Sequence, residues 1–123
     1  MGGHRGYVLV VDDDADVRDV IALVLGERHE VRAVDDGADA VRLCAERAPD
    51  VIVLDLLVRG SVDGFGVVER LQASGCPSAF VIVSGAQPQD LARAADLPGV
   101  SELLPKPFQI DALVGAVERA LAR

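Results

Sequence analysis

Val8-Leu-Val-Val-Asp-Asp-Asp14 is the stretch of sequence that decides the fold of this chain. Its apolar residues continue a run that begins at Tyr7, which is too short for a helix and typical of a buried strand, and three aspartates end it. Apolar residues then recur at helical spacing from Val17 to Leu25. A buried strand, an acidic turn and an amphipathic helix in succession form the first unit of an alternating α/β chain.

The same strand-then-helix unit recurs along the rest of the chain. Further strands are expected at His29–Val34, Val51–Leu54, Ala79–Val83 and Val100–Leu104. Further helices are expected at Ala38–Ala48, Phe65–Ala73, Gln89–Asp96 and Ile110–Leu121. Strict alternation with nearly continuous apolar strands predicts a parallel sheet that is covered by helices on both faces. We expect residues 1–123 to form a single domain of this kind.

Four of the expected helices carry apolar stripes that should face the sheet. The first helix has Val17, Val20, Ile21, Val24 and Leu25 at helical spacing. The second has Val41, Cys44, Ala45 and Ala48, the third has Phe65, Val68 and Leu71, and the last has Ile110, Leu113, Val114, Val117 and Leu121. The opposite face of the first helix is made of small residues that would let another helix approach closely, with Leu23 at its border: Ala15, Asp19, Ala22 and Gly26.

Composition excludes several classes of protein. Half of the 123 residues are apolar and 3% are aromatic, which predicts a folded core of small aliphatic side chains and not a disordered chain. Twenty acidic residues against 12 lysines and arginines give a net charge of -8, which argues against direct binding to nucleic acid. No apolar run is long enough to span a membrane or to form a signal peptide. We therefore expect a cytoplasmic protein that does not bind membranes.

The two cysteines and two histidines show no metal-binding or disulfide pattern. Cys44 and Cys76 are too far apart for a CxxC motif and have no histidine cluster nearby, so we expect reduced, buried thiols. We expect His4 and His29 to have no partner and no functional role.

Polar residues end each expected strand. Asp12, Asp13 and Asp14 follow the first strand, Asp35 and Asp36 the second, Asp55 the third and Ser84 the fourth, while Lys106 lies just beyond the fifth. Ligands of parallel α/β sheets bind beyond the carboxyl ends of the strands, where neighbouring connections turn to opposite faces. These side chains are therefore expected to converge at one edge, although Asp35-Asp36-Gly37 is more simply a turn and helix cap.

Carboxylates, a hydroxyl and an ammonium at one edge are suited to phosphoryl chemistry. Asp12, Asp13 and Asp55 would repel one another, and Mg2+ would relieve this repulsion while leaving coordination positions for phosphate oxygens. Asp55 beside such an ion could attack phosphorus and form an acyl phosphate. Ser84 and Lys106, the only lysine in the chain, would neutralise charge on the transferred group. Taken singly, each acidic residue is also explained as a helix cap or a strand-ending turn residue.

Together these motifs resemble the receiver domain of two-component response regulators. The resemblance spans nearly the whole chain and rests on Val8-Leu-Val-Val-Asp-Asp-Asp14 with Arg18, Val51-Ile-Val-Leu-Asp55, Asp63-Gly64, Val81-Ile-Val-Ser-Gly85 and Leu104-Pro-Lys-Pro-Phe108. It implies a flavodoxin-like, doubly wound, five-stranded parallel sheet in the order 2-1-3-4-5 with five helices. It also implies signalling by contact with a downstream protein, which the sequence does not name.

The resemblance implies a magnesium site at the edge of the sheet where Asp12, Asp13 and Asp55 follow the strands, which we call the acidic edge. Asp13 would bind Mg2+ directly, and Asp12 would hold the ion through water. Asp55 and the backbone carbonyl of Leu57 would be further ligands.

The resemblance also implies the roles of the remaining polar residues. Asp55 would be the phospho-acceptor, the Ser84 hydroxyl would follow the phosphoryl group, and Lys106 would be its counter-ion. The phosphoryl donor would be a sensor histidine kinase or a phosphotransfer protein, docking on the first helix and beside Phe108. The chain would catalyse its own phosphorylation and dephosphorylation without being a metabolic enzyme.

Three stretches depart from the family pattern. Asp55-Leu-Leu-Val-Arg-Gly-Ser-Val-Asp63 is one residue longer than the usual loop and lacks its proline, which predicts a different backbone path. Leu103 stands where the family usually has tyrosine or phenylalanine, so we expect it to pack and not to switch. Leu97-Pro-Gly-Val100 replaces the usual small residues before the fifth strand, which predicts an atypical output face.

Alternative functions stay open. One is a receiver that belongs to a larger regulator with a DNA-binding or enzymatic output domain. Another is a magnesium-dependent phosphatase or phosphotransferase that forms a phospho-aspartate, although Leu57 stands where such enzymes commonly carry a second acid. A receiver that is never phosphorylated is disfavoured by the complete set of polar residues. A nucleotide-binding flavodoxin-like protein is disfavoured because no glycine-rich loop follows the first strand.

Overall fold

A computed structural model describes residues 5–122 of the chain. The elements alternate in the order β1 (Tyr7–Val11), α1 (Ala15–Gly26), β2 (Glu30–Val34), α2 (Gly37–Glu46), β3 (Val51–Leu54), α3 (Gly64–Ala73), β4 (Ala79–Ser84), α4 (Pro88–Ala95), β5 (Val100–Pro105) and α5 (Ile110–Leu121). Every strand and helix expected from the sequence is present, with ends within about two residues of the expected positions. No helix within residues 5–122 is long and apolar enough to cross a membrane.

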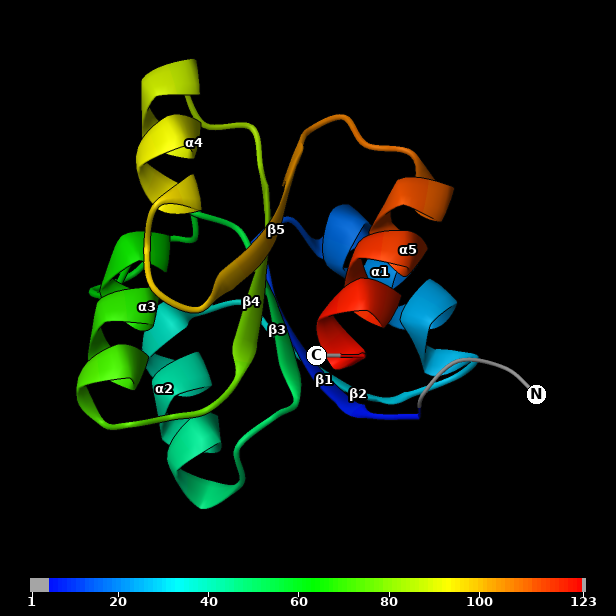
Figure 1. The fold of residues 1–123 in the computed structure, drawn as a ribbon, viewed down its shortest axis with the longest axis horizontal. Helices are drawn as coiled ribbons and strands as arrows, with labels where there is room; N and C mark the ends of the chain where they lie inside the picture. Colours follow the sequence, from blue (N-terminus) through cyan, green and yellow to red (C-terminus); the bar gives the residue numbers. More distant parts are fainter. Residues whose placement is uncertain (1–4, 123) are drawn as a thin grey trace.

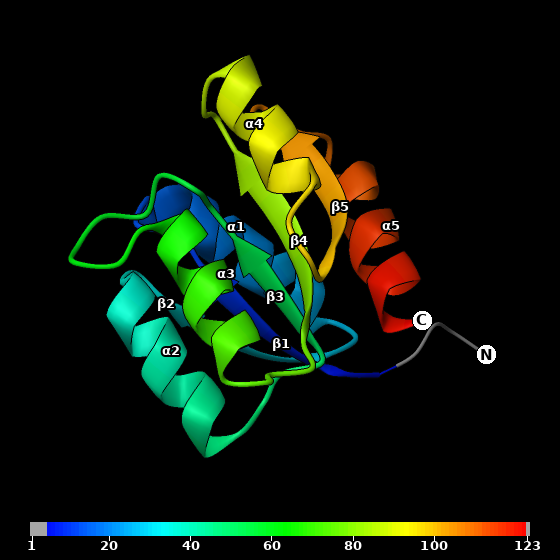
Figure 2. The same ribbon diagram turned by 60° about the vertical axis from the view of Figure 1, so that its left-hand side comes forward.

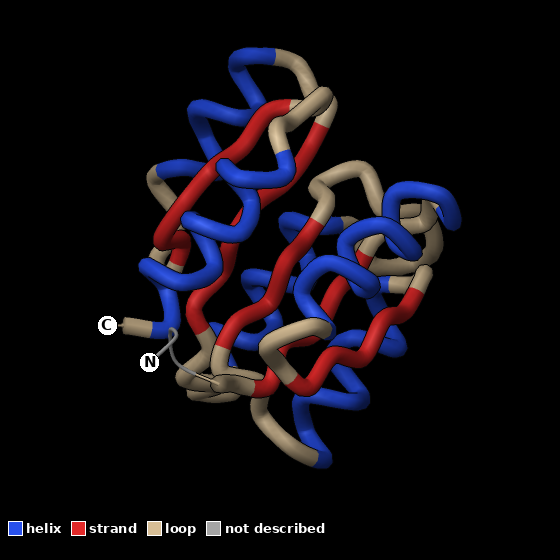
Figure 3. The backbone as a smooth tube through the Cα atoms, turned by 90° about the vertical axis from the view of Figure 1, so that its right-hand side faces the viewer, coloured by secondary structure: helices blue, strands red, loops and turns tan. Residues whose placement is uncertain are grey.

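The five strands form one parallel sheet in the order β2-β1-β3-β4-β5. Figure 3 shows the strands side by side with helices on either side of them. In this order β1 lies next to β3, and the helices that follow these two strands, α1 and α3, cover opposite faces of the sheet (Figure 1). The predicted flavodoxin-like fold is confirmed.

The sheet separates two apolar cores. On one face α2, α3 and α4 pack over buried strand residues that include Leu9, Ile52 and Phe80. On the other face α1 and α5 pack over the alternate strand residues, among them Val8 and Val53. Neighbouring residues of a strand point to opposite faces of the sheet, and helices cover both faces. The apolar residues of each strand must therefore lie between the two layers of helices, which fixes where each strand ends.

Aspartates begin three of the helices. Asp14 caps α1 by accepting hydrogen bonds from two backbone N–H groups of the first turn, and Asp36 caps α2 in the same way. Asp63 accepts one such bond at the start of α3. A side-chain cap of this kind stabilises a helix by about 1 kcal/mol. The helix cap expected at Asp35-Asp36-Gly37 is confirmed, with Asp36 as the capping residue.

The helix with the smallest buried face is α4. Ala94 is its only buried residue, whereas each of the other four helices buries two or more. No side chain caps its N-terminus at Gln87. The Arg93 guanidinium stacks on the ring of Phe65 in α3, with 3.9 Å to the ring centroid. The position of α4 therefore depends on few contacts.

Three helical stripes differ from the sequence prediction. In α1, Ile21 and Leu25 are buried but Val20 is 45% exposed, because a narrower face than predicted meets the sheet. Ile110, at the start of α5, is likewise 47% exposed. In α2 the buried face is centred one position earlier than predicted, so that Ala45 and Ala48 are exposed and the buried residues are Gly37, Ala40, Leu43 and Cys44.

The expectation that His29 has no partner is wrong. His29 is buried just before β2, where its Nδ1 accepts a hydrogen bond from the Gly6 N–H at 3.2 Å and its Nε2 lies 3.7 Å from Glu118. The other predicted bystander, His4, lies outside the described residues.

The two thiols are free, as predicted, but differ in burial. Cys44 is buried, and burial raises the pKa of its thiol to about 12, so that it packs as a neutral group. Cys76 is only half-buried, because it lies at a turn where its Sγ is 3.3 Å from Ser78 Oγ.

Candidate functional site

The carboxyl ends of β1 and β3 lie side by side and carry two buried aspartates. The Asp55 N–H donates to the Val11 carbonyl at 3.0 Å, which continues the pairing of these strands and brings Asp55 next to Asp12. Asp12 and Asp55 are only 2% and 5% exposed. Since β1 and β3 lead to helices on opposite faces, this edge is the crevice where ligands of doubly wound sheets bind.

Three donors hold the Asp55 carboxylate. The Ser84 hydroxyl donates to Oδ1 at 2.6 Å, and the Leu57 N–H donates to the same oxygen at 2.9 Å. The Lys106 ammonium donates to Oδ2 at 2.9 Å. Ser84 is fully buried at the end of β4, and its carbonyl accepts a hydrogen bond from the backbone N–H of Lys106 at 2.9 Å. The ends of three strands thus orient one carboxylate.

Lys106 bridges two carboxylates. Its Nζ lies 2.8 Å from Asp12 Oδ2 and 2.9 Å from Asp55 Oδ2. Burial alone would lower the pKa of Lys106, but the hydrogen bonds to both carboxylates outweigh burial and raise it. Burial raises the pKa of Asp12, and the hydrogen bond from Lys106 opposes this change only in part. The ammonium therefore stays charged and compensates part of the buried negative charge.

Asp13 completes a cluster of three carboxylates. One oxygen atom from each of Asp12, Asp13 and Asp55 lies within 4.8 Å of the others. Asp13 is half-buried, and its Oδ2 faces Arg59, accepting a hydrogen bond from the Arg59 N–H at 3.1 Å. Oxygen atoms at this spacing suit a hard divalent cation. The predicted convergence of these carboxylates with Ser84 and Lys106 is observed.

Two arginines contact the site without having been predicted to do so. Arg18 Nη1 donates to the Asp12 carbonyl at 2.9 Å, and Arg59 contacts Asp13 from the loop between β3 and α3. Arg18 belongs to the first motif that resembles receiver domains, although no role was assigned to it there, and Arg59 belongs to a loop of unusual length.

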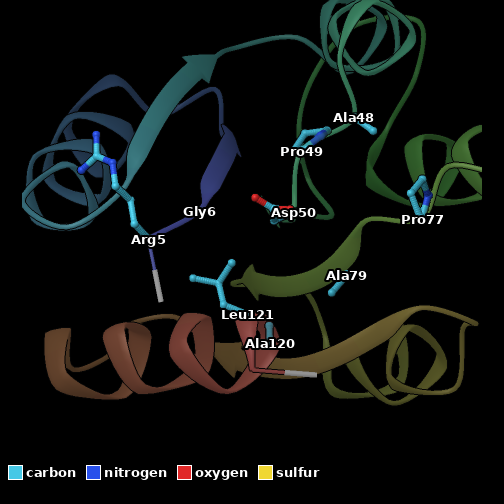
Figure 4. Close-up of a pocket in the computed structure, with 9 residues that line it drawn as sticks. All are labelled: Arg5, Gly6, Ala48, Pro49, Asp50, Pro77, Ala79, Ala120 and Leu121. Atoms are coloured by element: carbon cyan, nitrogen blue, oxygen red, sulfur yellow. The ribbon is translucent and has the colours of Figure 1, made fainter. Parts of the chain in front are cut away.

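A cavity of about 520 Å³ lies at the opposite edge of the sheet (Figure 4). It is lined by residues at the amino ends of the strands and at the end of α5, including Leu121. Arg5 and Asp50 are the two lining residues that ionise, and the Asp50 carboxylate already accepts a hydrogen bond from the Tyr7 N–H at 2.8 Å. This cavity lacks the cluster of nucleophilic and charged groups found at the acidic edge, which is therefore the candidate site.

Comparison with known proteins agrees with this geometry. The sequence matches the family model of the response regulator receiver domain over residues 8–118. The chain belongs to this family. The receiver is 33% identical over 120 residues to the DNA-binding transcriptional regulator NtrC of Escherichia coli, covering 97% of the chain and 25% of NtrC. It is 30% identical over 124 residues to the DNA-binding response regulator MtrA of Mycobacterium bovis, covering 100% of the chain and 54% of MtrA.

Solved receiver structures share the fold over nearly their whole length. The receiver domain of NtrX from Brucella abortus superposes with a TM-score of 0.85 at 33% identity, over 94% of this chain and 98% of that domain. The Francisella response regulator 1452 receiver domain gives a TM-score of 0.88 at 26% identity, over 97% and 98% of the two chains. The curated relatives are longer, since this receiver spans a quarter of NtrC and about half of MtrA.

Two apolar residues in and after β5 pack against the two cores. Leu103 is half-buried and packs against the core beneath α2, α3 and α4, which agrees with a packing role. Phe108 is half-buried against the core beneath α1 and α5.

Asp12→Asn is expected to stabilise the metal-free receiver at pH 7, raising the melting temperature by about 2–5 °C. Burial raises the pKa of Asp12 above its ordinary value of 3.8, so the folded state binds its proton more tightly than the unfolded state. The ionised Asp12 carboxylate therefore costs the folded state stability. This loss is absent at pH values below the ordinary pKa of Asp12, and it grows as the pH rises through the higher pKa of the folded state. The gain from asparagine should therefore disappear in thermal melts at pH 3. A gain of equal size at pH 3 and pH 7 would show that packing, and not charge, is responsible.

Proposed function

We propose that this receiver accepts a phosphoryl group on Asp55 from a sensor histidine kinase or a phosphotransfer protein, and signals by contact with a downstream protein. The observation that supports this most strongly is the Asp55 carboxylate held between the Ser84 hydroxyl and the Lys106 ammonium. A strand-ending turn residue needs neither group. Membership of the receiver family supports the same function.

We propose Mg2+ as the cofactor of this reaction. The donors at the acidic edge are carboxylate oxygens within 4.8 Å of one another, which is the chemistry and spacing that Mg2+ favours. Asp13 would bind the ion directly and Asp12 through water, with Asp55 and the Leu57 carbonyl as further ligands. When bound, the ion supplies positive charge to the oxygens of the transferred group.

In the proposed reaction an Asp55 carboxylate oxygen attacks the phosphorus atom of a phosphohistidine. The P–N bond breaks, its electron pair returns to the imidazole nitrogen, and the new O–P bond forms an acyl phosphate. The Ser84 hydroxyl and the Lys106 ammonium already contact Asp55, so they are placed to bind the arriving phosphoryl oxygens. Attack of water on phosphorus later restores the carboxylate and releases phosphate.

Labelling with a small phosphodonor tests this proposal. In the presence of Mg2+ and acetyl phosphate, intact-mass spectrometry should show the addition of one phosphoryl group. With Mg2+ and beryllofluoride, which imitates a phosphoryl group, NMR signals near Asp55 should shift. Absence of labelling by acetyl phosphate and by a phosphorylated phosphotransfer protein would contradict the proposed function.

Lys106→Ala is expected to separate phosphorylation from the structural response. The variant should still be labelled, at a rate roughly tenfold to a hundredfold lower, because Asp55 and the ion site persist. The ammonium that the new anion attracts is absent, so NMR signals of residues 100–108 should barely move with beryllofluoride. We expect the wild-type response to centre on residues 84–96, since Leu103 has no ring to rotate. Wild-type shifts in residues 100–108 of this variant would show that the coupling takes another route.

We propose that the phosphodonor docks on a surface formed by α1 and the start of α5. Leu23 is 74% exposed on α1, and the half-exposed Val20 and Ile110 extend this apolar surface. A groove between the two helices is lined by Val24 and Ile110, and it continues to the charged residues Glu27 and Arg28 after the end of α1. Because α1 begins directly after the acidic edge and α5 begins shortly after Lys106, a helical partner seated there would reach Asp55.

A second proposal concerns the output. The chain covers 25% of NtrC and 54% of MtrA, both named as DNA-binding regulators, which supports a receiver that controls an output domain. Its own net charge of -8 argues that the receiver itself does not contact nucleic acid. We propose a cytoplasmic location, where two-component kinases deliver their phosphoryl groups. Phosphorylation-dependent binding of the receiver to a candidate output protein would test this.

A further inference from the structure

The loop between β3 and α3 brings a positive charge to the acidic edge. The Arg59 N–H donates to Asp13 Oδ2 at 3.1 Å, and its side-chain Nε lies 3.3 Å from the same oxygen. The Arg59 side chain is 91% exposed, whereas that of Asp13 is 24% exposed. The guanidinium can therefore leave Asp13 for water without disturbing the core.

Buried residues on either side of Arg59 fix the path of this loop. Val58 and Val62 are each 3% exposed and belong to the core beneath α2, α3 and α4. Gly60 has a φ of 109°, which glycine adopts without strain, and a Cβ there would lie 3.0 Å from the Asp36 carboxylate. Figure 2 shows this green loop projecting at the end of the sheet, before the chain enters α3. The loop is thus anchored at both sides while Arg59 itself faces Asp13.

We propose that the Arg59 guanidinium occupies the cation position at Asp13 in the metal-free receiver and is displaced when a divalent cation binds, so that Arg59 sets the Mg2+ affinity. This inference rests on the proposed function, in which Asp13 binds Mg2+ directly. A guanidinium and a divalent cation on one carboxylate repel each other, so the ion binds against this repulsion. The hydrogen bond from the Arg59 backbone N–H to Asp13 does not depend on which side chain stands at position 59. The loop is therefore expected to stay in place when Arg59 is replaced. Arg59 is therefore a positioning residue, which acts on the ion through Asp13.

Calorimetric titration with MgCl2 tests this inference. We expect Arg59→Ala to bind Mg2+ about three- to tenfold more tightly than wild type at low ionic strength, with a smaller difference at high salt. Arg59→Lys keeps the charge and should stay close to wild type. Arg42→Ala is the matched control, because Arg42 is also an exposed arginine in an ion pair but lies on α2, paired with Glu46. It removes the same net charge and should leave the Mg2+ affinity within about twofold of wild type.

Several outcomes would overturn the inference. Unchanged or weaker Mg2+ binding by Arg59→Ala would show that the guanidinium does not compete with the ion. An equal gain in Arg42→Ala would show that only net charge matters. In wild type, the NMR signal of the Arg59 Nε–H should shift during the titration, and a signal that stays still would also contradict displacement. If the wild-type receiver neither binds Mg2+ nor becomes phosphorylated, both the proposed function and this inference fail. If the wild-type receiver binds Mg2+ and is labelled normally, but wild type and Arg59→Ala bind Mg2+ with equal affinity, only the role of Arg59 is overturned.

Discussion

Asp55→Asn is expected to abolish phosphorylation, with labelling by acetyl phosphate falling at least about a thousandfold. The amide has nearly the shape of the carboxylate, but it is not a nucleophile toward phosphorus. Asparagine can still accept hydrogen bonds through its side-chain oxygen, so the surrounding contacts with Ser84 or Lys106 are kept in part. Intact-mass spectrometry after treatment with Mg2+ and acetyl phosphate measures the effect.

Asp35→Asn is the control for this variant. Asp35 is exposed after β2, and its replacement removes the same charge without touching the acidic edge. We expect its labelling to match wild type, and thermal melts of both variants should show folded proteins. Labelling of Asp55→Asn at undiminished yield would mean that another residue is the acceptor.

Ala22→Glu is expected to reduce phosphoryl transfer from the cognate kinase by about a hundredfold, while acetyl phosphate labelling of Asp55 stays at the wild-type level. Ala22 is half-buried on α1, next to the exposed Leu23. A longer, charged side chain there would obstruct a helical partner and would lose hydration in the interface. Comparing the two donors on one preparation separates docking from chemistry.

Ala45→Glu serves as the control for docking. Ala45 is exposed on α2, which covers the other face of the sheet, so transfer from the kinase should be unchanged. If Ala22→Glu lost labelling by both donors equally, the substitution would have damaged the fold. If it lost neither, the kinase would dock elsewhere.

The strand ends explain why so much of the site could be predicted from the sequence. In a parallel sheet that is buried on both faces, each strand is a run of apolar residues. The polar residue that follows the run must therefore lie at the end of the strand. The sequence therefore predicts that Asp12, Asp55 and Ser84 lie together. Their convergence depends on β1 lying next to β3, and the family resemblance supplied that order.

Other contacts depend on loop paths and helix rotation, which periodicity does not describe. Arg59 reaches Asp13 only because Val58 and Val62 anchor a loop of unusual length. His29 was expected to be isolated, yet the turn before β2 buries it against Gly6 and Glu118. Helical spacing also predicts the wrong face for part of α2, because the alanines of that helix lie on more than one side, Ala40 buried and Ala45 exposed.

The shallow packing of α4 has a consequence for the speed of signalling. A helix that buries only Ala94 and has no side-chain cap opens at a low free-energy cost, so its amides should exchange with solvent earlier than those of the other helices. Local openings of this kind occur in microseconds to milliseconds. A loop of only three residues joins Ser84 to α4, so a displacement of Ser84 is expected to shift the population of the open helix. The receiver would then report the state of Asp55 almost as soon as it changes, and the lifetime of the acyl phosphate alone would set the duration of the signal.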